Sequence, residues 1–299
     1  MATDLASYRD RVLLGGSDYR GELRRRGWPD SDPCETAVLT RPDLVRDLMD
    51  GWLDAGAGLL LTNTATANTL AVAEDAADRS NVDLGEINRR AAVLALETAG
   101  RVSRSVLVVG VVGGCARLLR LAELTETEIA SASVQQGEVL AAAGVGALLC
   151  RGFAELEALK VAVSALVAAT AIPIIGSLVF EAGAERGETL LGVTPPQAAA
   201  ELAEAGAAAI GCEAGDWPDE LSGVVSLIRQ STALPIWVET SAGGPLVIDG
   251  HLGYPESPEV FASRAKGLAE AGGNLIVGGP GVTIEHLAEA VSLLGRGRV

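Results

Sequence analysis

Charged side chains stand at the ends of three apolar runs that read as buried strands. Arg151, Glu213 and Glu239 each lie at or just after the last residue of such a run. A guanidinium in that position forms charge-assisted hydrogen bonds with a carboxylate or a phosphate. The partner can be an anionic small molecule, or the two glutamates can form an internal ion-pair network with Arg151 and Arg20. The sequence leaves both arrangements open.

Uncharged polar side chains stand at the ends of other runs. Threonine, serine and asparagine there either bind a ligand or fix the loops by hydrogen bonds to the backbone, and both roles stay open. Of the two histidines, His251 lies in a long loop near these ends, whereas His286 belongs to a phrase typical of helix capping. The candidates are Thr62, Asn63, Thr64, Asn68, Ser177 and the turn Ser241–Gly243.

These residues need a scaffold that brings strand ends together. Eight short runs of Val, Ile, Leu and Ala alternate with amphipathic helical segments, which is typical of a parallel sheet covered by helices. Eight units favour a closed (β/α)8 barrel of TIM type over an open sheet, and one domain over residues 1–299. The predicted strands are 11–15, 58–62, 106–111, 147–151, 173–178, 208–212, 235–239 and 274–278. The predicted helices include 42–55, 84–99, 126–143, 155–169, 195–205 and 258–271.

Glycines mark the rhythm of these units. Gly56, Gly144, Gly206 and Gly272 each follow an alanine and stand between a predicted helix and the next strand, where glycine caps helices. In such a barrel, active sites lie at the carboxyl ends of the strands. We therefore expect the candidate residues to meet at that end, beside the glycine-rich loop 241–258.

Composition excludes several classes of protein. The formal net charge of −16 argues against a nucleic-acid partner, which needs clustered Lys and Arg. No apolar run reaches the roughly 20 residues that a bilayer crossing needs, so no membrane partner is expected. The N-terminal residues lack the basic start and apolar stretch of a secretory signal, which favours the cytoplasm.

Cysteine spacing and glycine motifs predict no cofactor. The four cysteines, Cys34, Cys115, Cys150 and Cys212, are widely separated and form no Cys-x-x-Cys pair. This spacing supports neither a disulfide framework nor a compact zinc motif. The glycine-rich phosphate loops of dinucleotide-binding and P-loop proteins do not occur.

Several phrases, taken together, resemble the homocysteine S-methyltransferase family. They are Leu-Thr-Arg-Pro-Asp-Leu-Val at 39–45, Asp-Ala-Gly-Ala at 54–57, Thr-Asn-Thr-Ala-Thr-Ala-Asn at 62–68, Glu-Ile-Asn-Arg-Arg at 86–90, Ser-Ala-Gly at 241–243 and Thr-Ile-Glu-His at 283–286. The resemblance covers almost the whole chain. It implies the (β/α)8 fold and descent from enzymes that transfer a methyl group to homocysteine.

The resemblance also implies a zinc site whose ligands are missing. Gly279 and Pro280 stand where the family has a cysteine pair, and Ala214 stands where its first zinc cysteine follows the sixth strand. None of these side chains can donate to zinc. Cys212 lies two residues before Ala214 and can face the same side of the strand, but we expect a buried core cysteine, since one thiolate makes no stable zinc site.

Two further family positions differ in charge. The glutamate that in the family receives the ammonium of the amino acid is replaced by Arg151, which repels an ammonium and attracts an anion. The first-strand aspartate of the family aligns with Gly16, and Asp18 is the nearest substitute. The resemblance therefore implies an altered substrate site.

Two functions follow as hypotheses. The chain is either a methyltransferase relative that acts without zinc on a different, anionic small molecule, or a catalytically silent barrel that serves as a binding partner, in a homo-oligomer or with a related subunit. Unchanged methylation of homocysteine conflicts with the chemistry. A thiol of pKa about 8.5 is only a few per cent ionised at neutral pH without a metal.

Overall fold

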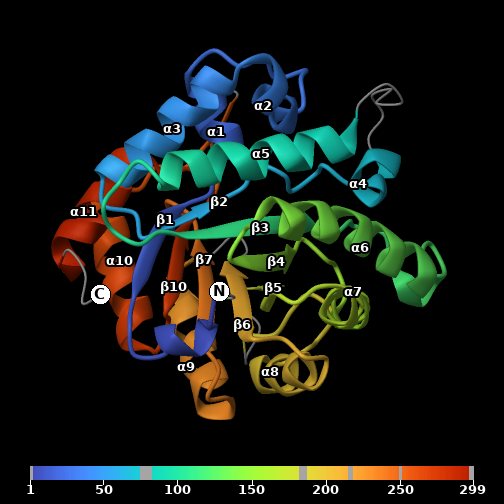
Figure 1. Ribbon diagram of the computed structural model, residues 1–299. Helices are drawn as coiled ribbons and strands as arrows, with labels where there is room; N and C mark the ends of the chain where they lie inside the picture. Colours follow the sequence, from blue (N-terminus) through green and yellow to red (C-terminus); the bar gives the residue numbers. More distant parts are fainter. Residues whose placement is uncertain (1–2, 75–82, 182–186, 215–217, 249–250, 296–299) are drawn as a thin grey trace.

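Eight parallel strands form one sheet, and helices lie around it (Figure 1). The computed structural model describes residues 3–74, 83–181, 187–214, 218–248 and 251–295. The strand order is β1-β10-β7-β6-β5-β4-β3-β2. The strands are β1 (Leu13–Gly16), β2 (Leu59–Leu61), β3 (Leu107–Gly113), β4 (Ala147–Arg151), β5 (Ile174–Phe180), β6 (Ala209–Ala214), β7 (Ile236–Thr240) and β10 (Leu275–Gly278).

The sheet closes on itself through its first strand. β1 pairs in parallel with β10, with Leu13 opposite Leu275. On the other edge of β1, the backbone N–H of Gly58 donates to the carbonyl of Leu14 at 2.9 Å. The predicted (β/α)8 barrel is confirmed, and each predicted strand boundary differs from the observed one by at most two residues.

The helices begin where the sequence carries capping signals. Thr125 and Glu128 form a reciprocal capping box at the start of α6. Proline occupies the first turn of α3, α8 and α10, where its missing N–H leaves no hydrogen bond unmade. The helices are α1 (Tyr19–Arg25), α2 (Ala37–Thr40), α3 (Pro42–Asp54), α4 (Thr69–Glu74), α5 (Leu84–Ala99), α6 (Glu126–Ala143), α7 (Leu156–Ala169), α8 (Pro195–Glu204), α9 (Leu221–Ser231), α10 (Pro258–Glu270) and α11 (Ile284–Leu294), with 3-10 turns η1 (Leu5–Tyr8), η2 (Cys34–Thr36), η3 (Leu119–Leu121) and η4 (Pro218–Glu220).

Glycine ends four of these helices, as predicted. Gly56, Gly144, Gly206 and Gly272 all have positive φ, which L-residues with a side chain adopt rarely. At Gly272, where φ is 112°, a Cβ would also lie 2.7 Å from the side-chain Cδ of Arg229. The chain can therefore turn from α10 into β10 only through a residue without a side chain.

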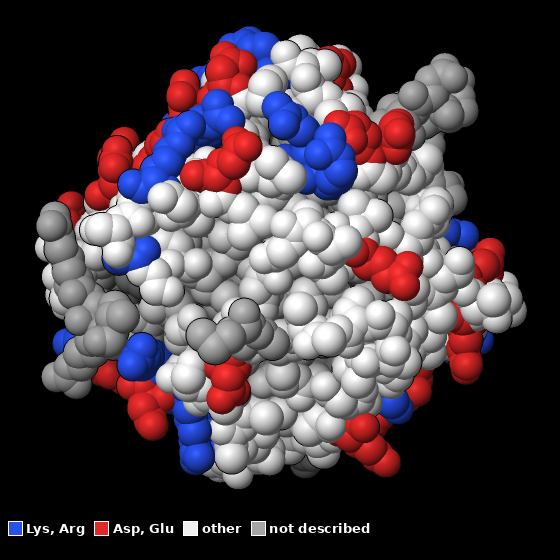
Figure 2. Space-filling view, viewed as in Figure 1, with Lys and Arg blue, Asp and Glu red and all other residues white. Residues whose placement is uncertain are grey.

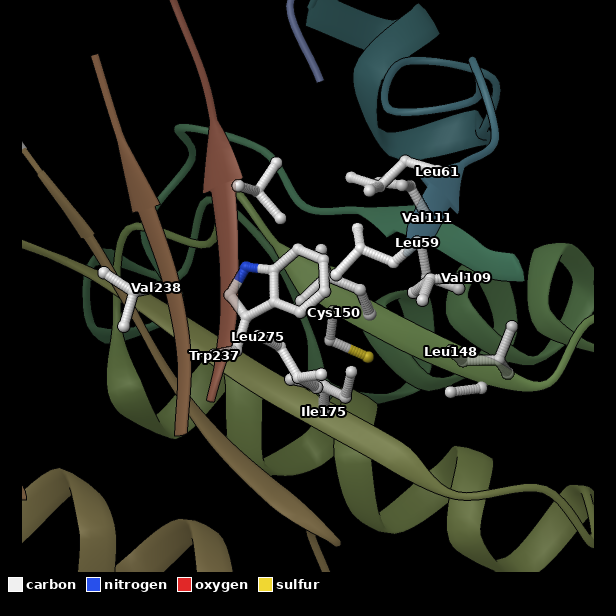
Figure 3. Close-up of a cluster of buried hydrophobic side chains, with 14 of the residues drawn as sticks. Leu59, Leu61, Val109, Val111, Leu148, Cys150, Ile175, Trp237, Val238 and Leu275 are labelled. Atoms are coloured by element: carbon white, nitrogen blue, oxygen red, sulfur yellow. The ribbon is translucent and has the colours of Figure 1, made fainter. Parts of the chain in front are cut away.

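The interior of the barrel is packed with apolar side chains. The indole of Trp237 lies across the interior among the side chains of Leu59, Val109 and Ile175, and all four residues are fully buried (Figure 3). At the amino-terminal end of the strands, Asn274 joins three segments of the chain. Its Oδ1 accepts from the backbone N–H of Ile236 at 2.9 Å, and its Nδ2 donates to the carbonyl of Arg9 at 2.7 Å.

The long loop after β7 contains structure that the sequence did not predict. Within 241–258, β8 (Leu246–Ile248) and β9 (His251–Gly253) form an antiparallel pair. Each strand has three residues, which is too short for a side-chain period to be recognised. The side chain of His251 lies outside the described residues.

The surface carries many interspersed charges. On the face shown in Figure 2, acidic and basic side chains alternate over the region of α1, α3 and α5, and a broad uncharged area lies beside them. No continuous basic field covers this face, in line with the excess of 39 acidic over 23 basic residues in the sequence. None of the helices described has the combination of length and apolar content that spanning a membrane requires.

Candidate functional site

Arg151, Glu213 and Glu239 meet at the carboxyl ends of the strands. The guanidinium of Arg151, from β4, is hydrogen-bonded to the carboxylate of Glu239 on β7. Its Nη2 lies 3.2 Å from Oε2 of Glu213 on β6. The side chain of Arg151 is 23% exposed, whereas those of Glu213 and Glu239 are 8% and 5% exposed. One cation thus bridges two buried carboxylates across the mouth of the barrel, and we call these three residues the mouth triad.

Burial and charge oppose each other within the mouth triad. Burial raises the pKa of Glu239 to about 7; the guanidinium of Arg151 opposes that rise, and the carboxylate of Glu213 adds to it. For Arg151, burial by itself lowers the pKa, but Glu239 and Glu213 outweigh burial and hold that pKa above its ordinary value. The guanidinium therefore stays charged, and a pKa of about 7 lets Glu239 take up a proton near neutral pH.

Gly279 leaves the space that the carboxylate of Glu239 fills. A Cβ built on Gly279 would lie 2.8 Å from Oε1 of Glu239 and 3.0 Å from its Cγ, both closer than carbon contacts allow without movement. The same Oε1 accepts a hydrogen bond from the hydroxyl of Ser17 at 3.2 Å. The carboxylate of Glu239 can therefore keep this position only while residue 279 has no side chain.

The residues at the implied zinc positions do not fit zinc. Ala214, Gly279 and Pro280 have no donor atoms, and a side chain at position 279 would meet Glu239. Among the residues described, no three His, Cys, Asp or Glu side chains are grouped as metal ligands. The side chains at these three positions cannot ligate a metal ion.

Cys212 does not supply a replacement ligand. Because Glu213 faces the mouth, alternation along β6 directs Cys212 to the other side of the strand. Its thiol is fully buried and lies 3.7 Å from the carbonyl oxygen of Trp237. Burial, followed by the charge of Glu213, raises the pKa of the Cys212 thiol. The prediction of a buried core cysteine is confirmed, and an inward-facing Cys212 is wrong.

The polar residues after β2 fix their own loop. The hydroxyls of Thr62 and Thr64 lie 2.7 Å apart, and the hydroxyl of Thr64 donates to the carbonyl of Val111 at 2.7 Å. In return, the hydroxyl of Thr62 accepts from the backbone N–H of Val111 at 2.9 Å. Both side chains thus serve the backbone of β3, which is the structural one of the two roles left open by the sequence.

Two asparagines of the same region are also engaged with backbone. Nδ2 of Asn63 donates to the carbonyl of Cys34 at 2.7 Å, which holds η2 against β2. Nδ2 of Asn68 donates to the carbonyl of Gly113 at 3.0 Å. The turn at 241–243 is closed internally, since the hydroxyl of Ser241 donates to the carbonyl of Gly243 at 2.9 Å. These groups shape the mouth from its rim.

Asp18 and Arg20 have partners outside the mouth triad. Oδ1 of Asp18 accepts from the N–H of Gly21 at 2.8 Å, and Oδ2 accepts from the N–H of Gly281 at 2.9 Å. Burial raises the pKa of Asp18, and these two bonds oppose that rise. Arg20 is exposed and lies near Cys34. Within the part of the chain that the structure describes, Arg20 forms no ion pair with Glu213 or Glu239.

Three buried polar atoms at the mouth have no hydrogen-bond partner among the residues that the structure describes. Ser177 faces inward, because a Cβ on the preceding Gly176 would meet Leu202 and Val163 of the helix layer. Trp237 lies two residues before Glu239 on β7 and was not among the residues predicted from the sequence. The signal that could have found it is this spacing, which puts its side chain on the same side of the strand as that of Glu239. The atoms are Oε1 of Glu213, Oγ of Ser177 and Nε1 of Trp237.

His286 has the capping role that the sequence predicted. Its Nδ1 lies 2.9 Å from the hydroxyl of Thr283 and 3.3 Å from the backbone nitrogen of the same residue, at the start of α11. Its Nε2 lies 2.9 Å from the carbonyl oxygen of Glu256 and holds the loop after β9. This histidine therefore stabilises a helix start and does not reach the mouth triad.

Known proteins resemble this chain in sequence and in fold. The chain is 26% identical over 267 residues to a methionine synthase of Mycobacterium leprae and 26% identical over 260 residues to that of Mycobacterium tuberculosis, and it spans 22% of the length of each. The metallated homocysteine methyltransferase MmuM of Escherichia coli has the same fold, with a TM-score of 0.76 and 19% identity over 94% of this chain and 96% of that chain.

A more distant likeness is the methyltransferase from Methanosarcina mazei, with a TM-score of 0.58 and 12% identity over 97% of this chain and 96% of that one. These structural likenesses show the fold alone. The sequence profile of homocysteine S-methyltransferases matches residues 1–294, which is nearly the whole chain. The chain belongs to the homocysteine S-methyltransferase family.

Proposed function

We propose that this family member binds a small molecule at the mouth of its barrel without zinc, as a methyltransferase relative that does not methylate homocysteine. The observation that carries the proposal is the position of Glu239. Its carboxylate fills the space beside Gly279 and pairs with Arg151. A protein side chain and its partner thus occupy the place where the family resemblance implies a metal ligand.

The chemistry of a homocysteine thiol supports the same conclusion. Zinc lowers the pKa of a bound thiol, and the described residues include no group of three side chains that could hold zinc. Arg151 also stands where the resemblance implies a carboxylate for the ammonium group. A homocysteine molecule placed as in the family would therefore meet a guanidinium at its ammonium and no metal at its sulfur.

A catalytically silent barrel is the second candidate, and the internal pairing of Arg151 favours it. A guanidinium neutralised by Glu213 and Glu239 has no unused charge with which to attract an anionic substrate. The unpartnered atoms of Glu213, Ser177 and Trp237 favour the binding role instead, because buried polar groups ordinarily have hydrogen-bond partners. We therefore rank small-molecule binding first.

Metal analysis and calorimetry test the proposal. After dialysis against metal-free buffer, we expect less than stoichiometric zinc, and titration with homocysteine at neutral pH should give no saturable heat. One tightly held zinc per chain, or micromolar binding of homocysteine, would refute the proposal. A thermal-shift screen of small amines, carboxylates and phosphate esters separates the two candidates, since a silent barrel is stabilised by none of them.

A further inference from the structure

The mouth contains more negative than positive charge. The mouth triad has one guanidinium and two carboxylates. A further carboxylate, that of Asp18, accepts from the N–H of Gly281, which lies two residues after Gly279. Arg25 approaches Asp18 at 3.7 Å, and that arginine is also bound to Glu22. The cluster at the strand ends therefore lacks one positive charge when both glutamates are ionised.

One carboxylate oxygen is left without a donor. Oε2 of Glu213 faces Arg151, but Oε1 is buried and has no hydrogen-bond partner among the residues that the structure describes. An ionised carboxylate is an acceptor only, so Oε1 requires an N–H or O–H group from outside the set already described. A buried acceptor without a donor is costly to the fold, which indicates that a bound group meets it.

The other unpartnered atoms lie on neighbouring strands. Ser177 on β5 is in register with Gly211 on β6, which in turn is in register with Trp237 on β7. Gly211 has no side chain, and a Cβ there would lie 2.5 Å from that of Ser177, so β5 and β6 approach this closely only through a glycine. This row lies one inward step below Glu213 and Glu239. A ligand that reaches Oε1 of Glu213 therefore has two unpartnered polar groups one step below it, the hydroxyl of Ser177 and the indole N–H of Trp237.

We propose that the mouth binds a small ligand that carries a primary or secondary ammonium group, whose nitrogen donates to Oε1 of Glu213. The assignment rests on the proposed small-molecule function and names the charge class of its ligand. This positive charge is opposite to that of the anionic ligand that the sequence predicts from Arg151 alone. The partners of Arg151 cause the reversal, because they turn a lone cation into a cluster with a net negative charge.

An anionic ligand fits this geometry poorly. It would bring a third negative charge to a guanidinium that already faces the carboxylates of Glu213 and Glu239. An ammonium leaves both ion pairs in place and compensates the second carboxylate. The raised pKa of Glu239, which follows first from its burial, agrees with a cluster short of positive charge.

Three probes with the same carbon frame test the charge class. Binding of n-propylamine, 1-propanol and propionate to the full chain is measured by saturation-transfer NMR at pH 7.5. We expect propylammonium to bind about tenfold or more tightly than propanol, as a charge-assisted hydrogen bond implies, and propionate not to bind. Glu213→Gln should lose that preference, whereas Glu86→Gln, on an exposed face of α5, should keep it.

The relative affinities of the three probes for the unaltered chain decide the question even if Glu213→Gln fails to fold. Binding of propionate as tightly as propylamine would overturn the assignment and leave the zinc-free binding function standing. An absence of saturable binding by all three would also overturn it. Zinc content and homocysteine binding test the proposed function separately.

Discussion

Replacing Arg151 with methionine tests the mouth triad directly. Methionine keeps an apolar stem of similar length and removes the guanidinium, so two buried carboxylates face each other without a cation. Removing one partner of a buried ion pair costs ~3–5 kcal/mol of unfolding free energy. Because 23% of the Arg151 side chain is exposed, water relieves part of this loss. We expect a loss of about 2–4 kcal/mol at pH 8.

The loss should depend on pH in a defined direction. Without the guanidinium, the pKa of Glu239 rises further above its value of about 7. Between pH 6 and pH 8 the folded variant then keeps its proton on Glu239, whereas the folded unaltered chain loses most of it and the unfolded chains hold almost none. The stability of the variant therefore falls more steeply with rising pH. We expect the loss at pH 6 to be smaller than the loss at pH 8 by about 1 kcal/mol or more.

Urea unfolding followed by tryptophan fluorescence measures both quantities. The matched control is Arg89→Met, because Arg89 pairs with Glu86 on an exposed face of α5, where an ion pair contributes little to stability. Adding Glu239→Gln to Arg151→Met should restore about half of the lost stability, since it removes one of the two unpaired charges. A loss below about 1 kcal/mol at pH 8, or no recovery in the double variant, would refute the buried pairing.

Three further outcomes are expected. The pKa of Glu239 is about 7 in the folded chain against an ordinary value of 4.5, so between these two pH values the folded state holds more protons than the unfolded state. The free energy of unfolding should therefore fall as pH rises from about 5 to 7. Glu239→Gln should flatten that slope in urea titrations. Gly279→Ala should destabilise by ~1–3 kcal/mol through its overlap with Glu239, whereas Gly267→Ala, with open space in α10, should be neutral or stabilising; equal effects in thermal melts would contradict the packing. All four cysteines are buried, so a thiol reagent should label none rapidly in the native chain and all four in denaturant; fast labelling of any one would show that the mouth or core opens.

The scaffold was predictable because its signals are local. The predicted helix 126–143 matches α6, since Thr125 with Glu128 marks its start and Gly144 marks its end. Strand boundaries agree because each strand is a run of buried apolar residues between turns. The pair β8 and β9 was missed, since three residues do not show a period and neither strand belongs to the barrel.

The site was predictable only in part, because its decisive contacts join distant residues. The sequence places Arg151 at the end of a strand, and the fold confirms that position. It does not show that Glu239, which lies 88 positions away, pairs with it. The dependence of Glu239 on Gly279 and the hydrogen bond from Ser17 likewise appear only once β1, β7 and β10 are side by side. A sequence shows which side chains reach the mouth, but packing decides which of them neutralise one another.

The pairing of β1 with β10 has a consequence for how the chain is made. The ladder partner of Leu13 is Leu275, so the first strand finds its main partner only after some 260 further residues have been synthesised. Until then, the backbone N–H and C=O groups on one edge of β1 are unpaired and can bind other chains. The same holds for the free edge of the growing sheet. Nascent chains that stop before Leu275 should therefore be chaperone-dependent and prone to aggregation, and release of the last strand and α11 from the ribosome should coincide with the gain of protease resistance.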